Sequence, residues 1–156
     1  QDVLEGAGFD AYEVSNHARG AGARSRHNLI YWRGGDYLGV GPGAHGRVTT
    51  GGARWATLTP KRVGDYIAGV RSSGRGPAER TRLTALEAAQ ERLLMGLRTV
   101  EGVALAELAA LAIDPESIRA LREAGLIETP PDRLVATAAG RTVLDRIIVE
   151  LARGAG

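Results

Sequence analysis

The sequence predicts an α/β segment over residues 1–73, followed by a mostly α-helical domain over residues 77–156. All seven aromatic residues and all three histidines lie before the run SSGRGP at 72–77. A short stretch rich in Ser, Gly and Pro is typical of a connection between domains. The residues after it are mainly Leu, Ala, Ile and Val among Arg and Glu, with apolar residues at helical spacing. The two parts are therefore expected to fold differently.

The composition and net charge of the chain exclude several classes of protein and of site. The chain has 156 residues, of which 44% are apolar and 24% charged, as is ordinary for a globular protein with a core. No apolar run approaches the roughly 20 residues that span a bilayer, and no signal-peptide pattern is visible, so a cytoplasmic location is expected. The absence of cysteine excludes disulfides, thiolate nucleophiles and sulfur-bound clusters from this chain. A net charge of +2 does not require nucleic acid as a partner.

Two short strands are expected in the first part. Residues 9–14 form one, which ends in the polar sequence Ser15-Asn16-His17, and residues 37–40 form the other, with glycines on both sides. A short strand alone leaves its backbone groups unpaired. Both strands are therefore expected to be the last pieces of a larger α/β sheet.

A helix is predicted after Thr59. Thr59 suits the N-cap, Pro60 suits the first helical position, and Gly74 lies just beyond the expected end. The apolar face has the spacing i, i+3, i+4, i+7 and consists of Val63, Tyr66, Ile67 and Val70.

Two further helices open the second part. Thr84 and Glu87 have the spacing of a capping box, which predicts the start of the first. The second is expected over about residues 104–111. The apolar stripe of the first helix consists of Leu86, Leu93, Leu94 and Leu97.

A third helix, a hairpin and a last helix complete the prediction. Asp114 is a suitable N-cap, Pro115 suits the first position, and Gly125 suits the position after the end. The sequence LIETPPDRLVAT predicts a hairpin around its two prolines. The last helix has an apolar face of Val143, Leu144, Ile147, Ile148 and Leu151. Three helices, a hairpin and a helix in this order resemble a winged-helix arrangement.

The segment HNLIYW carries the first functional signal. His27 and Tyr31 share one face, and Asn28 and Trp32 another, whether the segment is a strand or a helix. A neutral imidazole can ligate heme iron, and an aromatic ring can cover a flat macrocycle. The alternative is structural: His27 and Asn28 hydrogen-bond the backbone in a turn while Trp32 fills a core.

The glycines of GVGPGAHG give the second signal. Gly41, Gly43 and Gly46 match G-x-G-x-x-G, but a dinucleotide loop must open a helix, and RVTTGGARW predicts a strand and a turn instead. The glycines are therefore expected to allow a close backbone approach, either to a ligand or to an adjoining strand.

DNA binding by the winged-helix-like part is a weaker interpretation. Its third helix carries Arg119 and Arg122, but Glu116 and Glu123 nearly cancel their charge. Helices that read a DNA groove usually carry an excess of positive charge. The histidines have no close metal-ligand spacing, and no catalytic Ser/His/Asp set can be assigned.

Three stretches together suggest a family: AYEVSNHA, SRHNLIYWRGGDYLGVGPGAHG, and the tail with GLIE and RLVATAAGRTVLDRII. They resemble the C-terminal portion of the radical SAM family that includes oxygen-independent coproporphyrinogen III oxidase and the HemW-type heme chaperone. The resemblance covers essentially the whole chain and is most specific between Tyr12 and Gly46. The His-Asn-x-x-Tyr-Trp pattern is more similar to the chaperone branch.

The resemblance implies a fold and a site. Residues 1–73 would be the last strands of a truncated radical SAM barrel, and residues 77–156 a winged-helix-like accessory domain. His27 would be a heme-iron ligand or would orient one. The implied heme-binding residues are His27, Asn28, Tyr31 and Trp32. The residues implied to face the barrel's cofactor are Ser15, Asn16, Gly41, Gly43 and Ala44.

The resemblance also implies cofactors and partners. The family holds a [4Fe–4S] cluster with three cysteines and binds S-adenosylmethionine, so both are expected in sequence outside this fragment, and no catalysis is expected from it alone. The leading expectation is a heme chaperone that passes heme to acceptor proteins, with membrane association only through an acceptor. A coproporphyrinogen III oxidase of porphyrin biosynthesis is the alternative, and a DNA-binding winged-helix module is a lesser one.

Overall fold

A computed structural model describes residues 2–153. The described chain forms two compact units, one made of the residues up to Gly34 together with those from Ala85 onward, the other made of residues 35–84. The predicted boundary at 72–77 therefore lies inside the second unit. The sequence could not show that the first residues associate with the helical second half, because that contact joins segments far apart in the chain.

The N-terminal segment folds as a small hairpin followed by a helix. After the helix α1 (Asp2–Gly6), the strands β1 (Asp10–Ala11) and β2 (His17–Ala18) pair antiparallel. The single strand predicted over residues 9–14 is thus wrong in length, because the chain turns back after Glu13, which forms a bridge with Thr99.

The HNLIYW segment is helical. A short 3-10 helix, η1 (Ala21–Ala23), precedes α2 (Arg26–Trp32). Ser25 is the N-cap, and its hydroxyl accepts a hydrogen bond from the backbone N–H of Asn28 at 3.4 Å. Of the two conformations left open by the sequence, the helix is the one formed.

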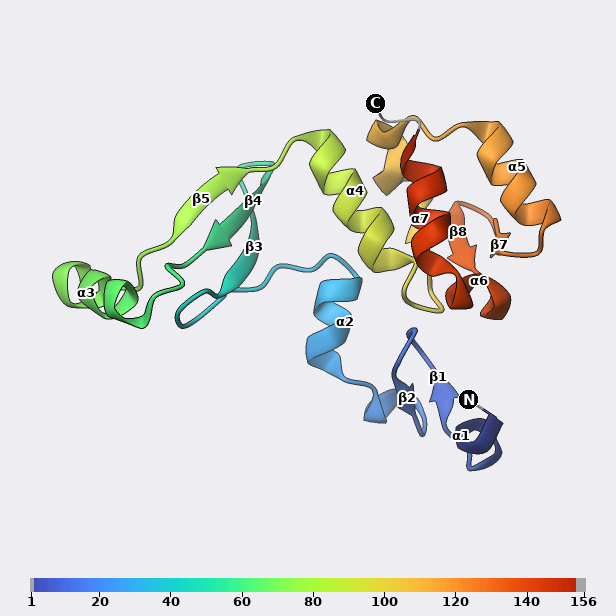
Figure 1. The fold of residues 1–156 in the computed structure, drawn as a ribbon, viewed down its shortest axis with the longest axis horizontal. Helices are drawn as coiled ribbons and strands as arrows, with labels where there is room; N and C mark the ends of the chain where they lie inside the picture. The colour runs from blue at the N-terminus through green and yellow to red at the C-terminus, as the bar shows by residue number, and fades with distance from the viewer. Residues whose placement is uncertain (1, 154–156) are drawn as a thin grey trace. The chain divides into compact units, whose positions relative to one another are not determined.

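The remainder of the first unit packs helices around one apolar core (Figure 1). Its helices, in chain order, are α4 (Ala85–Gly96), the 3-10 helix η2 (Leu105–Leu111), α5 (Pro115–Glu123), α6 (Ala138–Thr142) and α7 (Leu144–Ala152). The buried core residues are Ala89, Leu93, Leu97, Val103, Leu108, Leu111, Ile127, Leu134, Ala136, Leu144, Ile147 and Leu151.

Most of the predicted helix signals hold in this unit. Asp114 caps α5 by accepting from the backbone N–H of Glu116 at 2.9 Å, and Gly125 follows the helix with a φ of 67°. Two details differ. The helix predicted over 104–111 is a 3-10 helix, and Leu94, assigned to the apolar stripe, is 43% exposed.

A small antiparallel sheet completes the core. Its strands are β6 (Val103–Ala104), β7 (Ile127–Glu128) and β8 (Arg133–Ala136), in the order β6-β8-β7. The pairing of Ile127 with Ala136 confirms the predicted hairpin. Every named strand pair within residues 2–153 is antiparallel. The barrel strands and the winged-helix description remain predictions.

The second unit is a three-stranded antiparallel sheet with one helix. The strands β3 (His45–Thr50), β4 (Ala53–Leu58) and β5 (Glu79–Arg82) lie in that order, and α3 (Val63–Ser73) connects β4 to β5. The strand and turn predicted for RVTTGGARW are confirmed, with Gly51 and Gly52 at positive φ in the turn.

Two predictions for this unit need correction. Residues 37–40 form no strand; Tyr37 alone bridges to Arg47. Thr59 is not the cap of α3, which begins after Arg62, because the Thr59 hydroxyl is buried and bonded to the backbone of another segment. Gly74 does end the helix, with a φ of 71°.

Among the helices of residues 2–153, none combines the length and the apolar character that a membrane span needs.

The burial difference along α4 gives a testable prediction. Leu93 is 1% exposed and Leu94 is 43% exposed. Leu93→Ala is expected to lower the free energy of unfolding by about 2–5 kcal/mol, because it removes packed methyl groups and leaves a cavity. Leu94→Ala, the same change on the same helix, should lower it by less than about 1 kcal/mol. Urea denaturation measures both, and equal losses would contradict the described orientation of α4.

Candidate functional site

The outward face of α2 presents two rings as a pair. His27 and Tyr31 are one helical turn apart, their ring centroids are 4.6 Å apart, and the rings meet edge to face. The Tyr31 hydroxyl lies 2.5 Å from Nε2 of His27, and Oδ1 of Asn28 lies 3.4 Å from Nδ1. The tautomer with its proton on Nδ1 donates to Asn28 and accepts from Tyr31. An incoming metal that uses Nε2 must therefore displace the Tyr31 hydroxyl.

Trp32 faces a different direction from this pair. Positions 27 and 32 are five residues apart, which places them about 140° apart around an α-helix. The Trp32 ring packs against the guanidinium of Arg98, whose central carbon is 4.7 Å from the ring centroid. Its indole Nε1 is buried and has no hydrogen-bond partner among the described residues. The structure thus gives Trp32 an inward-facing position, apart from the exposed His27.

Ser15 and Asn16 surround a buried carboxylate. Glu13 is 1% exposed, and its Oε1 accepts hydrogen bonds from the backbone N–H and the hydroxyl of Ser15, both at 2.8 Å, and from Nδ2 of Asn16 at 2.5 Å. Nη2 of Arg98 lies 3.6 Å from the other oxygen. Burial alone would raise the pKa of Glu13, but the hydrogen bonds from Ser15 and Asn16 and the charge of Arg98 together hold it below its ordinary value. Glu13 is therefore ionised in the folded protein.

Both ends of α2 are fixed to the rest of the first unit. The backbone N–H of Ser25, before the helix, donates to the Tyr12 hydroxyl at 3.1 Å. After the helix, Arg33 donates to both carboxylate oxygens of Glu101, from Nε at 2.9 Å and from Nη2 at 2.6 Å. Nη1 of Arg92 donates to the Trp32 carbonyl at 2.9 Å. These contacts hold the helix so that its His27 face stays outward.

Sequence reasoning missed Glu13, Arg98 and Glu101. A carboxylate between Tyr12 and Val14 in an apolar run was a usable signal, because a charge buried in a strand must be paired. No local pattern identifies Arg98, since its contacts with Glu13 and Trp32 join residues far apart in the sequence.

The glycine segment lies in the second unit and is bound to the residues before α3. The Thr59 hydroxyl donates to the Gly41 carbonyl at 2.5 Å and accepts from the Ala44 backbone N–H at 2.8 Å. The Gly43 N–H donates to the Pro60 carbonyl at 2.9 Å. Gly41 and Gly43 have φ values of 103° and 69°, which L-residues rarely adopt. Glycine is needed at these two positions for the positive φ, whereas the expected close approach occurs at Gly46, where a Cβ would lie 3.0 Å from the Tyr37 carbonyl oxygen.

The donor set of this chain does not fit an iron–sulfur cluster. The sequence contains no cysteine to supply thiolates. Within the part of the chain that the structure describes, no three His, Asp or Glu side chains come together as a metal site. No chemical step can therefore be assigned to a cluster held by these residues.

Comparison with known proteins identifies the family. A model of the HemN C-terminal domain matches residues 83–143. Radical S-adenosyl methionine domain-containing protein 1, mitochondrial, of Bos taurus is 38% identical over 162 residues, which cover 96% of this chain and 36% of that protein. Heme chaperone HemW of Mycobacterium tuberculosis is 38% identical over 146 residues, which cover 93% of this chain and 35% of that protein. The chain belongs to the HemW-like radical SAM family.

This chain is much shorter than the relatives that it matches. The chain spans about a third of the length of these two relatives, and 23% of the related Danio rerio protein. The solved structure of coproporphyrinogen III oxidase (HemN) from Escherichia coli, a radical SAM enzyme, aligns with a TM-score of 0.67 over 97% of this chain and 39% of that chain, at 16% identity. At this identity the alignment shows a shared fold.

The ionised Glu13 gives a pH-dependent prediction. Its pKa in the folded chain lies below the ordinary 4.5, so the carboxylate stabilises the fold above that pH, and this contribution is lost as the pH falls through the folded-state pKa. Glu13→Gln is expected to lower the free energy of unfolding by about 1–3 kcal/mol at pH 7, because it removes a charge that faces Arg98 in a buried position. The deficit should shrink as the pH falls below 4.5.

Glu128→Gln is the matched control, because Glu128 is an exposed carboxylate on β7. It should change the unfolding free energy little at either pH. Urea denaturation of all three proteins across this pH range measures the difference, and a constant deficit in Glu13→Gln would contradict the assignment of an ionised, partnered Glu13.

Proposed function

We propose that this chain carries the heme-docking segment of a heme chaperone, with the exposed His27 of α2 as the iron ligand. The observation that supports it most is the outward-facing imidazole, paired with Tyr31 and oriented by Asn28 on a helix fixed at both ends. An imidazole held in one tautomer is a suitable heme-iron ligand.

The surroundings of His27 suit a flat macrocycle with acidic edges. Ile30, on the same helix, is 43% exposed and provides apolar contact area. Arg26, also exposed, precedes His27 and can pair with a propionate carboxylate. Arg33 is already paired with Glu101, so we assign it a structural part rather than a contact to heme.

The exposure of this site favours transfer over permanent storage. A heme held at an open helix surface by one protein ligand, in competition with the Tyr31 hydroxyl, dissociates more readily than one enclosed in a core. We propose that the acceptor is another protein, that transfer takes place in the cytoplasm, and that S-adenosylmethionine and the cluster act outside the residues of this chain.

Hemin titration tests the ligand assignment. The chain is expected to bind hemin saturably, with a Soret band typical of a histidine-ligated iron. His27→Ala should weaken binding at least about tenfold, because it removes the axial ligand. His45→Ala is the matched control, since His45 is an exposed histidine in the second unit and should bind hemin as the parent does. Equal affinity of the parent and His27→Ala, with both folded, would refute the assignment.

The contact between Tyr31 and His27 predicts that removal of the hydroxyl strengthens hemin binding, whereas removal of the imidazole weakens it. Tyr31→Phe removes the hydroxyl 2.5 Å from Nε2 and keeps the ring. If iron takes Nε2, the variant should bind hemin about two- to tenfold more tightly, because no hydrogen bond has to be broken. Release of hemin to excess apomyoglobin should slow by a similar factor. Weaker binding in Tyr31→Phe would instead mean that the hydroxyl contacts the ligand or that iron is bound through another atom.

A further inference from the structure

A cavity of about 420 Å³ opens in the first unit beside the junction of α6 and α7. Val14, from the turn after Glu13, lines one part of it, and Arg98, after the end of α4, lines another. Arg141 and Arg146 line it from the α6–α7 side. This cavity is distinct from the His27 face of α2, and none of the residues implicated in heme ligation lines it.

We propose that this cavity binds an oxyanion, a carboxylate or a phosphate, through Arg98, Arg141 and Arg146. Planar guanidinium groups pair with both kinds of oxyanion through two parallel N–H donors. The proposal does not depend on the heme-docking function, because it rests on a different group of residues.

The three arginines retain donors for a ligand. Arg141 donates from Nη1 to the Ala136 carbonyl at 3.1 Å, which uses one of its five N–H groups. Nε of Arg98 is buried and has no hydrogen-bond acceptor among the described residues. The Arg98 side chain is 30% exposed and lines the cavity, so it can pair with an oxyanion there through its exposed part and not through the enclosed Nε.

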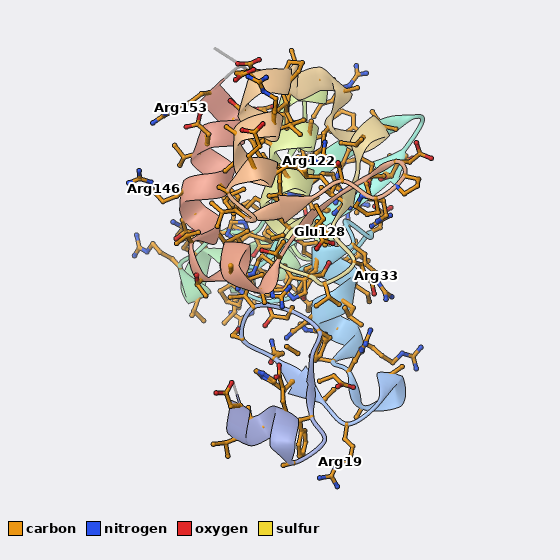
Figure 2. All side chains as sticks on the ribbon, turned by 90° about the vertical axis from the view of Figure 1, so that its right-hand side faces the viewer. Arg19, Arg33, Arg122, Glu128, Arg146 and Arg153 are labelled. Atoms are coloured by element: carbon orange, nitrogen blue, oxygen red, sulfur yellow. The ribbon has the colours of Figure 1, made fainter. Side chains whose placement is uncertain are left out.

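Arg146 is the exposed member of the group. Figure 2 shows it extending from α7 toward solvent, as Arg153 does just beyond the end of the helix. Arg153 is paired with Glu150 at 2.7 Å. Arg146 can therefore move onto a ligand at the cavity rim without giving up a buried contact.

The local charge favours an anion. The three arginines face two carboxylates, Asp145 in the cavity lining and Glu13 behind Arg98, which leaves an excess of one positive charge.

Phosphate titration followed by heteronuclear NMR tests the site. Inorganic phosphate at constant ionic strength is expected to shift the resonances of the cavity residues saturably. Arg146→Gln and Arg141→Gln should each weaken this binding by about tenfold, the loss of a charge-assisted hydrogen bond. Arg153→Gln, the same substitution just beyond the end of α7, should leave it unchanged. Arg146→Gln keeps the test valid if loss of the Arg141–Ala136 contact unfolds that variant.

Two results would overturn the proposal. One is the absence of saturable shifts in a folded chain. The other is an equal effect of Arg146→Gln and Arg153→Gln, which would mean that phosphate only screens the surface charge of α7.

A comparison of hemin with hemin dimethyl ester then identifies the source of the oxyanion. If a propionate fills the cavity, the ester should bind more weakly than hemin, and Arg146→Gln should remove this difference while His27→Ala affects both ligands. If the ester and hemin bind alike while phosphate still binds, the site takes a separate anion. Failure of hemin to bind at all would refute the heme-docking function. The phosphate titration would still decide whether the cavity binds an oxyanion.

Discussion

An ion pair between the buried carboxylate of Glu13 and the partly exposed Arg98 connects the N-terminal segment to the helical part of the first unit. The Glu13 carboxylate is enclosed, three hydrogen bonds reach one of its oxygens, and Arg98 lies 3.6 Å from the other. The same guanidinium packs against the Trp32 ring and lines the cavity at the start of α7. Removing one partner of such a pair leaves the other charge buried and uncompensated, which is strongly unfavourable. The turn after Glu13, the Trp32 ring of α2 and the wall of the cavity thus share contacts with one arginine.

This constraint divides α2 into two functional faces. Leu29 and Trp32 face the protein, where burial and Arg98 hold them, whereas His27 and Tyr31 face outward. Trp32, five residues after His27, is therefore not part of the same surface. Trp32 packs behind α2 on Arg98, and the proposed ligand-facing pair, His27 and Tyr31, lies one helical turn apart on the outer face.

The sequence predicted correctly those features that depend on neighbouring residues, and it missed those that depend on contacts between residues far apart in the chain. Asp114 and Gly125 were placed correctly because a helix cap is decided by a few neighbouring residues. Thr59 was misassigned because its hydroxyl has two possible uses, as a cap or as a partner of Gly41, and only the fold brings Gly41 within reach. Ser15 and Asn16 are expected from the family resemblance to face a cofactor, which stays a prediction, and in the structure both donate to the Glu13 carboxylate. The apolar run around Glu13 indicates a buried and paired carboxylate, but its partner Arg98 is far away in the sequence and no local pattern identifies it.

The two candidate sites are lined by different residues, and Arg98 contacts both the cavity and Trp32 of α2. An oxyanion bound to Arg98 would compete with Glu13 for the same guanidinium and would change how that group packs on Trp32. Because α2 is held from behind by Trp32, occupancy of the cavity can alter the helix that presents His27. The free energy of this coupling between the cavity and α2 can be no larger than the difference in Arg98 contacts between the empty and the occupied cavity. The reason is that a ligand shifts an equilibrium only by its differential affinity for the two states. The second anchor between Arg33 and Glu101 does not involve Arg98 and would keep the outward orientation of His27 while this exchange takes place.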